Sequence, residues 1–75
     1  MIPYTNKSGK SGIISYEIGD DFINVKFSDG KIYTYNNAIT GEENIKTMKE
    51  LAENGNELNS FISKIIRKNY ASKSA

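Results

Sequence analysis

Apolar and polar side chains alternate in the first half of the chain, in the manner of β-strands. Residues 22–27 show alternation with a period of two, with Ile23, Val25 and Phe27 on one face and Asn24 and Lys26 on the other. Residues 13–18 and 31–35 are rich in β-branched and aromatic side chains, which favour strands. Because only short turn signals separate the three segments, we expect a three-stranded antiparallel β-meander.

The turn at Asp29-Gly30 is compatible with two registers of the second hairpin. A two-residue turn sets Phe27 opposite Ile32 and places both Tyr33 and Tyr35 on the polar face of the sheet. A three-residue loop with a glycine bulge places both tyrosines on the apolar face instead. We expect the two-residue turn, because it pairs two apolar side chains, and the longer loop is the alternative.

The apolar period becomes helical after Asn37. Thr40 and Glu43 have the spacing of a capping box, and Asn54-Gly55 is typical of a helix end. Asn56 is expected to cap a second helix. The apolar positions of this second helix are Leu58, Phe61, Ile62, Ile65 and Ile66. We therefore predict an α+β fold, in which a three-stranded antiparallel β-meander is followed by two α-helices packed on one face.

We expect one domain over residues 13–70, a flexible arm at residues 1–12 and a polar tail at residues 71–75. The predicted core is apolar and draws on strands and helices alike. Its members are Ile14, Ile18, Ile23, Val25, Phe27, Ile45, Met48, Leu51, Phe61, Ile62, Ile65 and Ile66.

Composition excludes several kinds of chemistry. The chain has no cysteine and no histidine, so it has no disulfide, zinc knuckle, haem ligation or Ser-His-Asp triad. We expect no catalytic residues, no metal and no cofactor, and therefore not an enzyme. No stretch approaches the ~18 consecutive apolar residues of a membrane span. Since no secretory signal pattern is present either, we expect a cytoplasmic protein without a membrane partner.

Two tyrosines at strand spacing, close to cations, are the main candidates for binding. Aromatic rings beside cations can stack on unpaired nucleic-acid bases while the cations contact phosphates. The candidate nucleic-acid-binding residues are Tyr33, Tyr35, Lys26, Lys64, Arg67 and Lys68. With a net charge of +1, such binding is expected to be weak and salt-dependent. The alternative is that the tyrosines only fill the space between the sheet and a helix.

Several short motifs follow one another in a fixed order between about residue 11 and residue 70. They are Ser11-x-Ile13, Ile23-x-Val25-x-Phe27, the Asp29-Gly30 turn, Tyr33-x-Tyr35, Phe61, Ile66-Arg67 and Tyr70. In this order the chain resembles the KTSC domain, a small domain also found at the C-terminus of some lysyl-tRNA synthetases. The resemblance implies a small α+β fold and a role in RNA binding, without catalytic residues or a cofactor.

A second functional hypothesis is protein interaction or self-association without nucleic-acid binding. A three-stranded meander has two edges, and its thin core gains stability when an edge or an apolar surface pairs with a partner. The face on which the tyrosines lie distinguishes the two hypotheses. Burial of Tyr33 and Tyr35 by the helices would remove the stacking surface and favour protein interaction.

Overall fold

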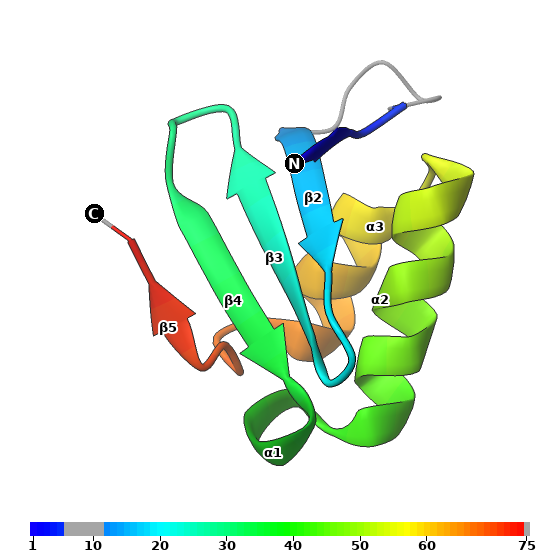
Figure 1. Ribbon diagram of the computed structural model, residues 1–75, viewed down its shortest axis with the longest axis vertical. Helices are drawn as coiled ribbons and strands as arrows, with labels where there is room; N and C mark the ends of the chain where they lie inside the picture. Colours follow the sequence, from blue (N-terminus) through cyan, green and yellow to red (C-terminus); the bar gives the residue numbers. More distant parts are fainter. Residues whose placement is uncertain (6–11, 75) are drawn as a thin grey trace.

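The computed structural model describes residues 1–5 and 12–74. Within these residues five strands form one antiparallel sheet in the order β1-β2-β3-β4-β5 (Figure 1). The strands are β1 (Ile2–Pro3), β2 (Ile13–Ile18), β3 (Phe22–Phe27), β4 (Ile32–Asn36) and β5 (Ser72–Lys73). The three central strands confirm the predicted meander, and two short strands extend it at both edges.

The helices follow β4, and all of them except the first cover one face of the sheet, as predicted (Figure 1). They are α1 (Asn37–Thr40), α2 (Glu42–Asn54) and α3 (Leu58–Phe61), which continues into the π-helix η1 (Ile62–Ile66). The chain then crosses to the free edge of β4 and forms β5. The α+β class is confirmed, with more strands than expected.

The β3–β4 hairpin has the longer of the two predicted loops. The Phe27 N–H donates to the Lys31 carbonyl at 2.9 Å, so residues 28–30 form the loop. Gly30 has a φ of 87°, which glycine adopts without steric strain. The Asp29 carboxylate also accepts a hydrogen bond from the Lys31 N–H at 3.0 Å, which stabilises this loop. The expected two-residue turn is therefore wrong.

This register brings both tyrosines of β4 to the helix-covered face. Ile23 lies opposite Tyr35, and Val25 lies opposite Tyr33. Since directly opposed residues share a face, the tyrosines lie beside the most buried residues of β3. The one-residue difference in loop length thus reverses the face that sequence reasoning favoured.

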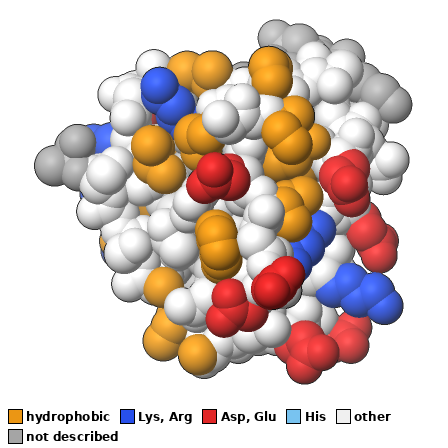
Figure 2. Space-filling view, in the orientation of Figure 1, with side chains coloured by type: hydrophobic (Ala, Val, Ile, Leu, Met, Phe, Trp, Pro, Cys, Tyr) orange, Lys and Arg blue, Asp and Glu red, His pale blue; other side chains and the backbone are white. Residues whose placement is uncertain are grey.

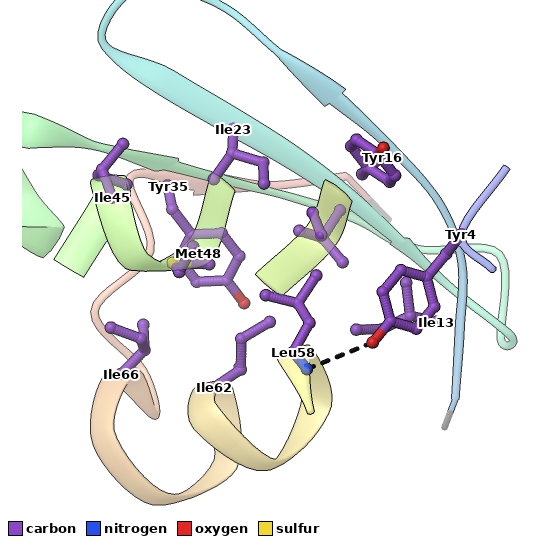
Figure 3. Packing of buried hydrophobic residues seen from close by; sticks show 12 residues of the cluster. Tyr4, Ile13, Tyr16, Ile23, Tyr35, Ile45, Met48, Leu58, Ile62 and Ile66 are labelled. Atoms are coloured by element: carbon purple, nitrogen blue, oxygen red, sulfur yellow. Dashed lines mark hydrogen bonds between the residues drawn. The ribbon is translucent and has the colours of Figure 1, made fainter. Parts of the chain in front are cut away.

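One hydrophobic core lies between the sheet and the helices (Figure 3). Its buried members are Tyr4, Ile13, Tyr16, Ile23, Val25, Tyr35, Ile45, Met48, Ala52, Leu58, Ile62 and Ile66. Six of the predicted residues are among them. Four other predicted residues, Ile18, Phe27, Leu51 and Phe61, are partly buried and pack against the core.

Two predicted core residues are exposed because the backbone departs from regular geometry. A β-bulge between Ile13 and Ser15 changes the alternation in β2, so Ile13 is buried and Ile14 is 47% exposed. In the second helix, the π-helical turn widens the helix after Phe61. Ile65 consequently turns outward and is 56% exposed.

Residues at both ends of the described chain belong to the fold. β1 pairs with β2, and Tyr4 is 7% exposed in the core. β5 pairs with β4 through Tyr33↔Lys73 and Thr34↔Ser72. Residues 2–4 and 72–73, which the sequence assigned to the flexible arm and the polar tail, are therefore paired with the sheet or buried in the core. The remainder of the expected arm, residues 6–11, and residue 75 lie outside the described residues.

Neither predicted helix cap forms. The Thr40 hydroxyl donates to the Asn69 carbonyl at 2.6 Å instead of capping α2. The residue that precedes α3 makes no side-chain cap, and the Leu58 N–H at the start of the helix donates instead to the Tyr4 hydroxyl at 3.3 Å (Figure 3). A cap 54 residues away has no local sequence signal.

Candidate functional site: an aromatic groove beside Arg67

A groove of about 380 Å³ separates the β3–β4 hairpin from α3 and η1. Its volume lies within the range of small-ligand sites in proteins. Its lining residues are Gly12, Phe27, Ser28, Asp29, Tyr33, Tyr35, Asn59, Ile62, Ser63 and Arg67. It contains three of the six residues that the sequence marked as binding candidates, namely both tyrosines and the arginine.

The sheet side of the groove is a row of aromatic rings. The rings of Phe27 and Tyr33 meet edge to face at 5.2 Å between centroids. Tyr33 and Tyr35 lie nearly parallel, with centroids 6.4 Å apart. Alternating positions on adjacent strands place these side chains on one face. The wall is therefore apolar, with the phenol hydroxyls as its only side-chain polar atoms.

The helix side carries polar side chains at a regular spacing. Asn59, Ser63 and Arg67 follow one another at intervals of four residues, which places them along one side of a helix. Ile62 lies between them and closes the floor of the groove. This spacing is the sequence signal that could have added Asn59 and Ser63 to the candidate site.

Tyr35 is almost completely buried, with 1% of its surface exposed. Its ring projects from the sheet toward the helices, with the hydroxyl directed toward Ile62 (Figure 3). Tyr35 therefore offers no free face to a base, and its predicted stacking role is wrong. Its hydroxyl has no hydrogen-bond partner among the described residues and is not sealed from solvent. Since Tyr35 lines the groove, we place this opening there.

Burial raises the pKa of Tyr35 well above its ordinary value, and the neighbouring Tyr33 and Tyr70 raise it further. The hydroxyl is therefore protonated at neutral pH. It can donate a hydrogen bond to a ligand that enters the groove.

Tyr33 is partly buried and makes contacts within its own chain. Tyr70 packs edge to face against it at 5.0 Å between centroids. The Lys73 ammonium lies 5.5 Å from the centroid of the Tyr33 ring, a distance typical of a cation–π contact. A base stacking on Tyr33 would have to compete with these contacts.

Arg67 is exposed and ends η1 with a φ of 54° and a ψ of −115°. A non-glycine residue is strained in this region of backbone space. No carboxylate pairs with its guanidinium in residues 1–5 and 12–74. Arg67 thus brings to the groove a cation that forms no ion pair within the described residues.

The other predicted cations do not join Arg67. Lys26 lies opposite Ile32, so it occupies the face of the sheet turned away from the groove. Lys64 lines a separate hollow with Phe61 and Ile65. Lys68 is exposed and lines none of the described hollows. The structure thus brings together Tyr33, Tyr35 and Arg67 and leaves the three lysines apart.

No cluster of three or more acidic residues suited to a metal ion occurs in the described parts of the chain. Likewise, none of the described helices has the length and apolar character needed to span a bilayer. Comparison of the chain with protein-family models, with curated proteins and with solved structures finds no match.

Proposed function

We propose that the chain is a non-catalytic protein-interaction module whose groove takes a short segment of a partner protein. The preferred segment carries an apolar or aromatic side chain next to a carboxylate. The observation that supports this most is the joint presence of the aromatic wall, the Arg67 guanidinium and the Tyr35 hydroxyl in one groove. Membership of the KTSC family is part of the proposal and rests on the motifs quoted above.

The polar groups of the groove specify the charge of the ligand. The Arg67 guanidinium is always protonated and can only donate. The Tyr35 hydroxyl donates as well, because its raised pKa keeps it protonated. Two donors among the lining residues favour an acceptor with negative charge, and a carboxylate matches a guanidinium in shape.

The apolar groups specify the body of the ligand. Phe27, Tyr33 and Ile62 are the other apolar and aromatic side chains that line the groove. Burying a side chain of the size of leucine or phenylalanine against them contributes about 1.5–3 kcal/mol before the entropic costs of binding. Association of this kind is expected to be weak, in the millimolar to micromolar range.

Nucleic acid fits this arrangement less well than a peptide. Only Arg67 among the predicted cations lines the groove, so a strand there would release few counterions. The α2 side adds repulsion, because Glu42, Glu43, Glu50 and Glu53 are exposed. Figure 2 shows acidic side chains concentrated toward that side of the molecule. RNA binding, which the KTSC resemblance implies, is therefore the competing outcome in the test.

The proposal includes no reaction. Asp29 is the only carboxylate among the lining residues. It accepts a hydrogen bond from the Lys31 N–H and so holds the hairpin loop. A structural role accounts for it, and the groove is expected to bind and release its ligand unchanged.

Amide chemical shifts during titration test the proposal. The first probe is the blocked peptide acetyl-Gly-Ser-Phe-Glu-Ser-Gly-amide, and the second is a hexauridylate RNA at the same concentrations. We expect the peptide to shift the amides of Tyr33, Ser63 and Arg67. We expect any RNA-induced shifts to be smaller and to fall as salt rises from about 50 to about 200 mM.

Two single variants serve as a matched pair in this titration. Arg67→Gln removes the groove cation and should weaken peptide binding about ten-fold. Lys64→Gln removes an exposed cation one helical turn away, outside the groove, and should leave the affinity unchanged. Equal losses in both variants would contradict the proposal, as would groove shifts caused by RNA and not by peptide.

A further inference from the structure

The segment after η1, residues 68–74, forms an arm that docks on β4. The Ala71 N–H donates to the Thr34 carbonyl at 2.7 Å, and the Ser74 N–H donates to the Ile32 carbonyl at 2.8 Å. The Thr40 hydroxyl adds a bond of 2.6 Å to a carbonyl of the arm. These bonds join the arm to residues 32–40, which form β4 and the helix after it.

Two side chains of the arm contact one residue of β4. Tyr70 packs against the Tyr33 ring, and Lys73 lies above it. The arm therefore combines a strand-edge pairing with an aromatic anchor and a cation. This is the mode by which an extended segment binds to the edge of a sheet. The edge of β4 is thus a docking site, and the structure shows one segment that fits it.

The connection between η1 and the arm is strained. Arg67 has positive φ without being glycine, and its ψ of −115° lies outside the ordinary left-handed helical region. The surrounding structure has to enforce such a conformation. If the connection became extended, Arg67 could adopt a backbone conformation without strain. Strained connections of this kind promote the exchange of structural elements between copies.

From these observations we infer that two copies of this chain exchange their arms, each arm docking on β4 of the other copy. The docking contacts are the same in the exchanged dimer as in the monomer. The equilibrium between monomer and dimer therefore depends on two opposing contributions. The loss of entropy on association favours the monomer, and the relief of strain at Arg67 favours the dimer. Higher protein concentration favours the dimer.

Introduced thiols can detect the exchange, because the chain has no cysteine of its own. Thr34 and Ser72 lie directly opposite each other, at a separation typical of disulfide-bonded residues. One chain carries Thr34→Cys, and a second chain of different mass carries Ser72→Cys. The two chains are unfolded, mixed, refolded together and then oxidised. We expect the disulfide between the two different chains, the mixed disulfide, to form a larger fraction of all disulfides than random pairing would give. This fraction should increase as the protein concentration during refolding increases.

The amide spectrum of each single variant first verifies its fold. Thr34 is only partly buried and Ser72 is exposed, so both changes should be tolerated. Adding Arg67→Gly to both chains removes the backbone strain and should lower the excess of mixed disulfide several-fold. A random distribution of disulfides at every concentration would overturn the inference. An excess that Arg67→Gly leaves unchanged would overturn the role assigned to the strained connection.

Discussion

Tyr35→Ala is expected to remove a large part of the free energy of unfolding of this protein. Tyr35 is among the largest fully buried side chains, and it belongs to the core between the sheet and the helices. Removing a large buried ring typically costs about 3 to 5 kcal/mol. Since a domain of this size is stable by roughly 4 to 11 kcal/mol, this loss is a large share of the total. Chemical denaturation monitored by circular dichroism measures the difference.

Tyr35→Phe is the matched control, because it keeps the ring and removes only the hydroxyl. That hydroxyl has no hydrogen-bond partner among the described residues. We therefore expect a change of less than about 1 kcal/mol. A small effect of the alanine variant, within about 1 kcal/mol, would mean that the ring lies on the solvent side of the sheet.

The same pair of proteins differs in its response to alkaline pH. Burial and then the nearby Tyr33 and Tyr70 raise the pKa of Tyr35 above its ordinary value of about 10. Above that pH the unfolded chain releases this proton and the folded protein retains it. The free energy of unfolding therefore falls as pH rises past about 10, by about 1.4 kcal/mol per unit for this one group. Tyr35→Phe should lack this part of the decline, as denaturation between about pH 9 and about pH 11 will show.

Tyr4→Ala is expected to destabilise the protein by about 3 kcal/mol, although Tyr4 lies in a segment with no helix or strand signal. Its side chain is 7% exposed in the core, and its hydroxyl accepts the hydrogen bond from the Leu58 N–H (Figure 3). The variant loses ring burial and also leaves a buried donor at the start of α3 without its partner. Thermal or urea unfolding measures the loss.

Two further variants separate these contributions. Tyr4→Phe keeps the ring and should cost about 1 kcal/mol, the typical value for a lost hydrogen bond. Ile2→Ala changes an exposed residue of β1 and should cost less than about 1 kcal/mol. If Tyr4→Ala proved as mild as Ile2→Ala, residues 1–5 would not be part of the fold.

Local patterns predicted the central elements well. The bounds of β2 and β3 agree with prediction, because alternation and turn residues are both local signals. The apolar stripe of α2 and its end before Gly55 also agree, and Gly55 has the positive φ that favours glycine there. Burial of Ile45 and Met48 follows from helical spacing alone.

Features that depend on one extra residue could not be predicted in this way. The bulge after Ile13, the three-residue loop before Lys31 and the π-helical turn after Phe61 each shift the register by one position. Each shift moves side chains between the core and the solvent. Ile14, Ile65 and the two tyrosines of β4 were misplaced for this reason.

Contacts between segments distant in sequence account for the remaining differences. Tyr4 and Leu58 form a hydrogen bond although 54 residues separate them in the sequence. β5 is a short polar strand that pairs with the edge of β4. For the candidate site, the residue types of Tyr33 and Arg67 were sufficient to select them. Their convergence in a groove, and the separation of Lys26 from them, could be predicted only with knowledge of the register between β3 and β4.

The central claim is that the tyrosines of β4 face the helices and form the wall of the groove. Nuclear Overhauser contacts from the Tyr35 ring protons test this most directly. We predict strong contacts to the side-chain protons of Met48 and Ile62, which pack in the same core (Figure 3). Contacts from this ring to the side chains of Asn24 and Lys26 instead would place it on the opposite face of the sheet and contradict the claim.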